Sequence, residues 1–154
     1  MRIPRTTARV LPVSADGAVL LLQEQDPARP GVTWWGTVGG AVDPGETLPE
    51  AAVREMREEI GLVVTTERLI GPIGTGIHEF SFAGVDYVSQ TNFFAMALER
   101  DVEVSFEHLE PEEVGNVLAA SWWFPEDLEV DGTAAQDDLP DVMRRAVAAV
   151  RGTA

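Results

Sequence analysis

Three glutamates, Glu55, Glu58 and Glu59, lie close together in the short run REMREE. On a helix that advances about 100° per residue, Glu58 and Glu59 fall within about 60° of Glu55, so the three side chains share one face. Like charges at these spacings destabilise a helix, and these lie near its C-terminal end, where the helix dipole already places negative charge. A solvated acidic face is the commoner reason for such a run. A hard divalent cation, which prefers oxygen ligands, would also explain it.

The segment that carries these glutamates is predicted to form a helix over residues 48–60. Thr47 and Glu50 fit a capping box, in which each residue bonds the backbone N–H of the other. Pro49 falls in the first turn, where its missing N–H costs little, and Gly61 suits the left-handed position that ends a helix. Local signals therefore fix both ends of the element that positions the acidic face.

The other elements are predicted from apolar runs and from the turns between them. Strands are predicted near residues 7–13, 18–24, 32–38, 62–71, 76–84, 85–99 and 121–124, a glycine turn at 39–40, a helix over 137–150, and hairpin turns at 16–17 and around 82–87. Residues 110–120 are ambiguous. Strands with interleaved helices indicate a single α/β or α+β domain over residues 1–154.

The composition excludes several classes of protein. Apolar residues make up 45% of the chain and the net charge is −15, which indicates a soluble globular protein. The 11 basic residues are all arginines and face 26 acidic residues, which argues against a nucleic-acid partner. Without cysteine, disulfides and thiolate chemistry are excluded. No apolar run is long enough for a membrane span or a signal peptide, so we expect a cytoplasmic protein without a membrane partner.

The spacing of the glutamates resembles the Nudix box, GX5EX7REUXEEXGU, in which U is a bulky aliphatic residue. The pattern begins at Gly40, continues through Glu46 and Arg54, and ends at Gly61 and Leu62. All nine specified positions are filled, which is far more specific than a glycine-rich loop alone. The N-terminal hairpin, the later strands and a late acidic segment also resemble MutT-like Nudix hydrolases, so we expect the resemblance to cover nearly the whole chain.

The resemblance implies a fold and an activity. The fold is an α/β/α sandwich with a mixed central sheet, in which the box forms a loop, a helix and a second loop. The activity is metal-dependent hydrolysis of a pyrophosphate bond in a nucleoside diphosphate linked to another moiety, by attack of a metal-activated water on phosphorus. Mg²⁺ is the expected cofactor, Mn²⁺ its substitute, and a small nucleotide the expected partner. The alternative is a catalytically inactive Nudix-fold domain that binds nucleotides or has a regulatory role. Such domains usually lack some of the specified residues of the box, whereas this box is complete.

The resemblance also assigns roles to individual residues. The metal-binding positions are matched by Glu55, Glu58, Glu59 and, through a backbone carbonyl, Gly40 or its neighbour Gly39. Glu46 and Arg54 match the pair that braces the loop against the helix.

One carboxylate must also accept or orient the proton of the attacking water. Glu55 and Glu58 are the candidates on the helix, whereas many family members use a glutamate from a distant loop. We predict Glu113 for this role, with Glu110 and Glu112 as alternatives. A solvated loop acid is the competing interpretation of Glu113.

The substrate-binding residues are the least constrained by the sequence. Aromatic faces stack on nucleobases, and neighbouring residues of a strand point to opposite faces, so at most one member of a Trp pair lines a site. We predict Trp35 for stacking and Arg29 for a phosphate, although packing and a surface position are the competing interpretations. An acidic interaction protein or calcium-binding protein without catalysis is a further alternative, and a homodimer is compatible with the sequence.

Overall fold

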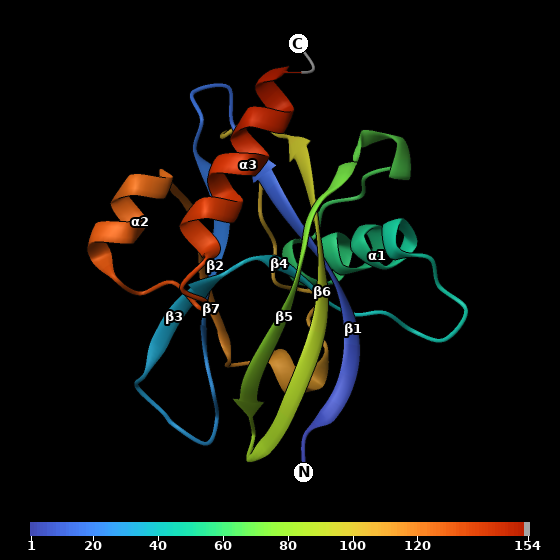
Figure 1. Cartoon of the computed structure of the whole chain (residues 1–154), viewed down its shortest axis with the longest axis vertical. Coiled ribbons are helices and arrows are strands. Elements are labelled where there is room, and N and C mark those ends of the chain that lie inside the picture. The colour runs from blue at the N-terminus through green and yellow to red at the C-terminus, as the bar shows by residue number, and fades with distance from the viewer. Residues whose placement is uncertain (153–154) are drawn as a thin grey trace.

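Seven strands form one sheet in the computed structural model, which describes residues 1–152 (Figure 1). The strands are β1 (Ile3–Val13), β2 (Val19–Gln25), β3 (Thr33–Gly36), β4 (Val38–Ala41), β5 (Ile70–Phe82), β6 (Val85–Ala97) and β7 (Val117–Trp123). The helices are α1 (Leu48–Ile60), α2 (Pro125–Asp131) and α3 (Leu139–Gly152), with 3-10 turns at Thr66–Arg68 and Pro111–Glu113. Within residues 1–152, no helix is both long and apolar enough to cross a membrane.

The sheet is mixed and it branches at its first strand. The main path runs β3-β2-β1-β6-β5, while β4 pairs with β1 and β7 pairs with β2. Strand β1 runs parallel to β6 along its whole length. On its other side β1 pairs with β4 from Thr7 to Val10 and with β2 at Val13. This change of partner curls the sheet and brings β4, which leads to α1, onto the middle of β1.

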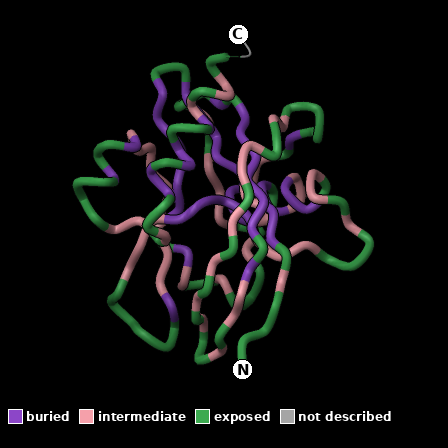
Figure 2. The backbone as a smooth tube through the Cα atoms, viewed as in Figure 1, coloured by how far each residue is buried: buried purple, intermediate pink, exposed green. Residues whose placement is uncertain are grey.

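Alternation along the strands builds two hydrophobic cores, one on each face of the sheet. One core lies against α1 and includes Val10, Leu20, Leu22, Phe94 and Met96. The other lies against α3 and includes Leu11, Val13, Leu21, Phe93 and Ala95. Figure 2 shows that the buried stretches of the backbone follow the central strands, whereas many of the loops are exposed. The α/β/α sandwich with a mixed sheet is therefore confirmed.

Helix α1 spans the residues that the sequence predicts. The Thr47 hydroxyl accepts from the Glu50 N–H at 3.2 Å, and the Glu50 carboxylate accepts from the Thr47 N–H at 2.9 Å. Gly61 follows the helix at φ 74°, in the left-handed region, and its N–H bonds back to the Arg57 carbonyl at 3.0 Å. The capping box and the glycine stop are both confirmed.

The predicted strand over residues 62–71 is wrong. This segment is irregular and contains the 3-10 turn at Thr66–Arg68, and β5 begins only at Ile70. The β-branched residues of this segment favour a strand, but only Val64 packs into the core beside α1. Val63 is 83% exposed and has no strand beside it. The prediction also missed α2, while residues 110–120 divide between the second 3-10 turn and β7.

Candidate active site

The strand β4 and the helix α1 meet at two glycines. The Gly39 N–H donates to Glu59 Oε1 at 2.5 Å, which ties the helix to the strand. A Cβ at Gly39 would lie 2.2 Å from the Ala8 carbonyl oxygen, and its φ of 143° suits only glycine. A Cβ at Gly40 would lie 2.6 Å from Glu55 Oε1. Glycine at position 39 therefore lets β4 pack closely against β1, and glycine at position 40 lets the Glu55 carboxylate approach β4.

Arg54 connects the loop before α1 to the acidic face of the helix. Its guanidinium donates to both carboxylate oxygens of Glu46, at 2.7 and 3.0 Å, and to the Ala41 carbonyl at 2.8 Å. Its Nη1 donates to Glu55 and to Glu58, each at 3.0 Å. The bonds from Arg54 hold the pKa of Glu46 below its usual range. The structure thus brings together the pair that the resemblance expects to brace the loop.

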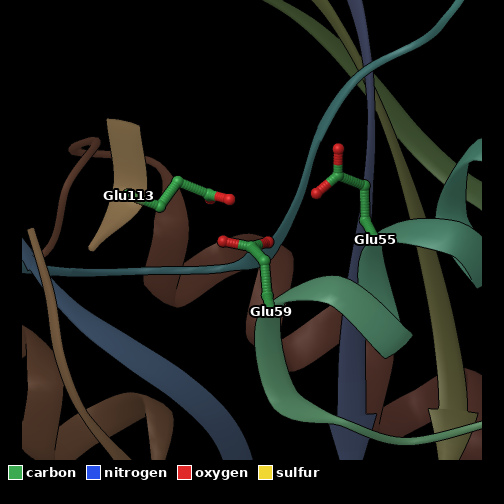
Figure 3. A group of neighbouring side chains, drawn as sticks. All are labelled: Glu55, Glu59 and Glu113. Atoms are coloured by element: carbon green, nitrogen blue, oxygen red, sulfur yellow. The ribbon is translucent and has the colours of Figure 1, made fainter. Parts of the chain in front are cut away.

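Three carboxylates from two distant segments face a common space (Figure 3). Oxygens of Glu55, Glu59 and Glu113 lie within 4.8 Å of one another. Glu113 ends the 3-10 turn that precedes β7, so the turn carries it to the face of α1. Glu110 and Glu112 are exposed and lie outside this cluster. Glu58 also lies outside the cluster, and its carboxylate accepts a hydrogen bond from Arg54.

Burial makes the carboxylates of Glu55, Glu59 and Glu24 hard to ionise together. Desolvation raises the pKa of Glu55 to about 7, with the charges of Glu58 and Glu113 adding to the effect. Desolvation raises the pKa of Glu59 well above its usual value, and the neighbouring charge of Glu24 adds to this. Burial also raises the pKa of Glu24 to about 7. A group of buried anions of this kind is stable near neutral pH only when protons or a cation neutralise it.

The residues present fit a hard divalent cation. The three carboxylates offer only oxygen atoms, which Mg²⁺ and Mn²⁺ prefer. Because Gly40 has no side chain, the Glu55 carboxylate lies directly against the backbone of β4. Because Glu59 and Glu55 are fixed by the Gly39 N–H and by Arg54, their oxygens are positioned before any ion arrives.

A cavity of about 530 Å³ opens between the sheet, β3 and the segment that precedes α3. Its lining includes the basic residues Arg9 and Arg29, three acids and several aromatic residues; the acids are Glu24, Glu79 and Asp138, and the aromatic residues are Trp34, Phe80, Phe82 and Phe93. Glu24 lines this cavity, and its negative charge also raises the pKa of Glu59 in the glutamate cluster.

The two predicted substrate residues lie in different places. Arg29 lines the cavity at its exposed edge. Trp35 does not line it, since it packs against the α3 core and meets Trp123 edge to face at 5.5 Å between ring centroids. Its neighbour Trp34 lines the cavity instead, as expected for adjacent residues of a strand that point to opposite faces.

Two groups of site residues are absent from the sequence-based prediction. Glu24 continues the alternation of Leu20 and Leu22 toward α1, and this signal could have placed it near the helix. The pair of His78 and Asp138 also lines the cavity, but it joins residues far apart in the chain that no local pattern connects.

The chain belongs to the family described as NUDIX domain, whose model matches residues 3–146. It is 43% identical over 51 residues to the dihydroneopterin triphosphate diphosphatase of Escherichia coli K12, covering 33% of this chain and 31% of that protein. It is 34% identical over 90 residues to the low-salt glycan biosynthesis protein Agl8 of Haloferax volcanii, covering 58% of this chain and 54% of that protein. The matches thus span less than two thirds of these curated relatives.

The solved structure of the E. coli dihydroneopterin triphosphate pyrophosphohydrolase has the same fold. It superposes with a TM-score of 0.66 at 23% identity, over 99% of this chain and 100% of that one. A Caenorhabditis elegans Ap4A hydrolase superposes with a TM-score of 0.61 at 21% identity, over 97% and 98% of the two chains.

Proposed function

We propose that this protein is a metal-dependent pyrophosphohydrolase that cleaves a pyrophosphate bond in a nucleotide or a nucleotide derivative. The observation that carries the proposal is the convergence of Glu55, Glu59 and Glu113 within 4.8 Å on a complete Nudix box. The adjoining cavity, with Arg9 and Arg29 in its lining, supports a phosphorylated ligand. A relative named as a diphosphatase of a triphosphate supports the same class of reaction.

Glu55 and Glu59 are proposed to hold the divalent ion, together with the Gly40 carbonyl. Mg²⁺, or Mn²⁺ in its place, would neutralise phosphate charge and lower the pKa of the water that it binds. The role of Glu58 as a further ligand stays a prediction, since its carboxylate already accepts a hydrogen bond from Arg54.

The other site residues are proposed to move the proton and to orient the substrate. Glu113 faces the two proposed ligands from the opposite segment, which supports its proposed role as acceptor of the proton of the attacking water. Arg54 keeps the loop and α1 in register. Arg9 uses Nη1 for the carbonyls of Thr37 and Gly39, and its remaining N–H groups can bind a phosphate oxygen.

The proposal is tested by measuring phosphate and pyrophosphate release from nucleoside triphosphates, dinucleotides, ADP-ribose and nucleotide sugars, with Mg²⁺ or with EDTA. Glu59→Gln is expected to lose both turnover and the thermal stabilisation that Mg²⁺ gives. Glu113→Gln is expected to lose roughly 10²- to 10⁴-fold in kcat and to keep that stabilisation. Glu112→Gln is the matched control, because Glu112 is the exposed neighbour outside the cluster. Full turnover in Glu59→Gln, or in EDTA for every substrate, would refute the proposal.

A further inference from the structure

A buried aspartate joins two hairpins of the sheet. Asp26 follows β2 at the start of the loop of residues 26–32 and is only 2% exposed. Its Oδ1 accepts from the Ala28 N–H at 2.9 Å, within the same loop, and from the Ala83 N–H at 2.8 Å, in the turn between β5 and β6. These two N–H groups hold the pKa of Asp26 below its usual range, so the carboxylate is ionised near neutral pH.

The bond to Ala83 closes the curled sheet around the cavity. The strand path begins with β3 and β2 and ends with β6 and β5, so the two hairpins lie at its opposite ends. Both hairpins line the cavity, through Arg29 and Trp34 on one side and through Phe80 on the other. In Figure 1 the tips of both hairpins lie at the lower end of the molecule.

A single side chain therefore holds the outer end of the cavity together. Within residues 1–152, the structure describes no other hydrogen bond between the loop of residues 26–32 and residues 80–86. Arg29 lies in the loop, and its Nε is 3.9 Å from Asp26 Oδ2. The two carboxylate oxygens thus differ, because Oδ1 joins the backbones of the hairpins while Oδ2 faces only a distant, exposed guanidinium.

We propose that Asp26 is a positioning residue that closes the cavity around the substrate by joining the loop of residues 26–32 to the β5–β6 turn. Without the bond to Ala83 the hairpins can separate, because each is held by its own strand pairing. The substrate then loses contact with one wall of the cavity, while the glutamate cluster, to which Asp26 does not belong, keeps its geometry. The inference rests on the proposed function, since the cavity is taken to hold the substrate of that cluster.

The closure is tested by amide hydrogen exchange measured by NMR, which needs neither substrate nor metal. A charged acceptor protects its donor, so Asp26→Ala is expected to raise the exchange rate of the Ala83 amide at least about tenfold. Asp26→Asn keeps an oxygen that can accept from both N–H groups, and its rate is expected to stay within about threefold of the wild type. The amide of Val10, in the buried middle of β1, provides the reference for global stability.

The effect on the ligand is tested by titrating the α,β-methylene analogues of ATP and GTP, with Mg²⁺, against tryptophan fluorescence. Trp34 lines the cavity and serves as the reporter. Asp26→Ala is expected to raise Kd at least about fivefold and to leave kcat within about twofold, whereas Asp26→Asn changes Kd less than about twofold. A merely structural aspartate would instead reduce the number of folded binding sites and leave the Kd of the remaining sites unchanged. Asp101→Ala is the matched control, because Asp101 is exposed and does not line the cavity.

The outcomes separate this inference from the proposed function. Equal exchange of the Ala83 amide in wild type and Asp26→Ala, an unchanged Kd in that variant, or no binding of either analogue to the wild type would overturn the role of Asp26, even if Mg²⁺-dependent turnover is found. An effect in Asp26→Asn as large as in Asp26→Ala would also overturn it, since the charge toward Arg29 would then be responsible. Loss of protection and of affinity in Asp26→Ala alone, without turnover of any substrate, would support this inference and refute the proposed function.

Discussion

Replacing Glu55 with glutamine is expected to stabilise the metal-free protein at alkaline pH while it impairs metal binding. Burial raises the pKa of Glu55 to about 7 in the folded state, against 4.5 for an ordinary glutamate. Below pH 4.5 the side chain is protonated in both states, so the raised pKa costs nothing. Between pH 4.5 and about 7 the unfolded chain ionises this side chain in water while the folded state keeps it protonated, so stability is lost progressively over this range. Above about pH 7 the folded state carries the buried charge as well, and the loss is complete.

The size of this effect follows from the two pKa values. Each unit of difference between the folded and unfolded pKa values costs about 1.4 kcal/mol. The difference for Glu55 therefore lowers the free energy of unfolding at pH 8 by about 3 kcal/mol. Glutamine removes the charge but keeps an oxygen that can accept from Arg54 Nη1. The gain has an upper limit of about 3 kcal/mol, because the ionic part of the Arg54 contact is lost. For a chain of this length that limit corresponds to roughly 10 °C in Tm.

Thermal melts of wild type and Glu55→Gln in EDTA, at pH 4.5 and at pH 8, measure this difference. The variant is expected to melt higher at pH 8 and equally at pH 4.5, and Mg²⁺ is expected to raise the Tm of the wild type only. Glu99→Gln, which neutralises an exposed carboxylate, serves as the control for net charge. A variant that melts lower than wild type at pH 8 in EDTA, or gains equally at both pH values, would show that Glu55 carries no desolvation penalty.

Three further substitutions test the parts of the site separately. Arg54→Lys is expected to lower the free energy of unfolding by about 2 kcal/mol in urea, because one ammonium cannot replace the two-oxygen contact to Glu46; an unchanged midpoint would contradict this. Gly40→Ala is expected to weaken Mg²⁺ binding at least tenfold by calorimetry, since its methyl group would displace Glu55; wild-type affinity would contradict this. Thr47→Ala is expected to cost about 1 kcal/mol through loss of the helix cap, with turnover at low temperature unchanged.

The helix and its acidic face could be predicted from the sequence because their determinants are local. The capping box, Pro49 and Gly61 specify where α1 begins and ends, and the helical period then places Glu55 and Glu59 on one side. These signals act over a few residues, so they do not depend on how the chain folds elsewhere.

The rest of the site depends on contacts between distant segments. The approach of Glu113 to α1 is set by where β7 pairs with β2, and no periodic pattern encodes that register. The choice between Trp34 and Trp35 follows from which face of β3 the sheet turns toward the cavity, a single-residue shift that the sequence leaves open. The contact of His78 with Asp138 needs β5 and the start of α3 to meet in space.

The branching of the sheet at β1 gives the proposed metal site and part of the cavity lining different supports in the fold. Strand β4, which carries Gly39 and Gly40, is hydrogen-bonded to the buried middle of β1, so the proposed metal site is anchored on the central strands. The cavity is lined by residues of β1, β2, β3, β5 and β6 and, outside the strands, chiefly by the loop of residues 26–32 and by residues 132–138. Grafting new sequences into these two segments should exchange the molecules that the protein admits while its chemical machinery stays in place.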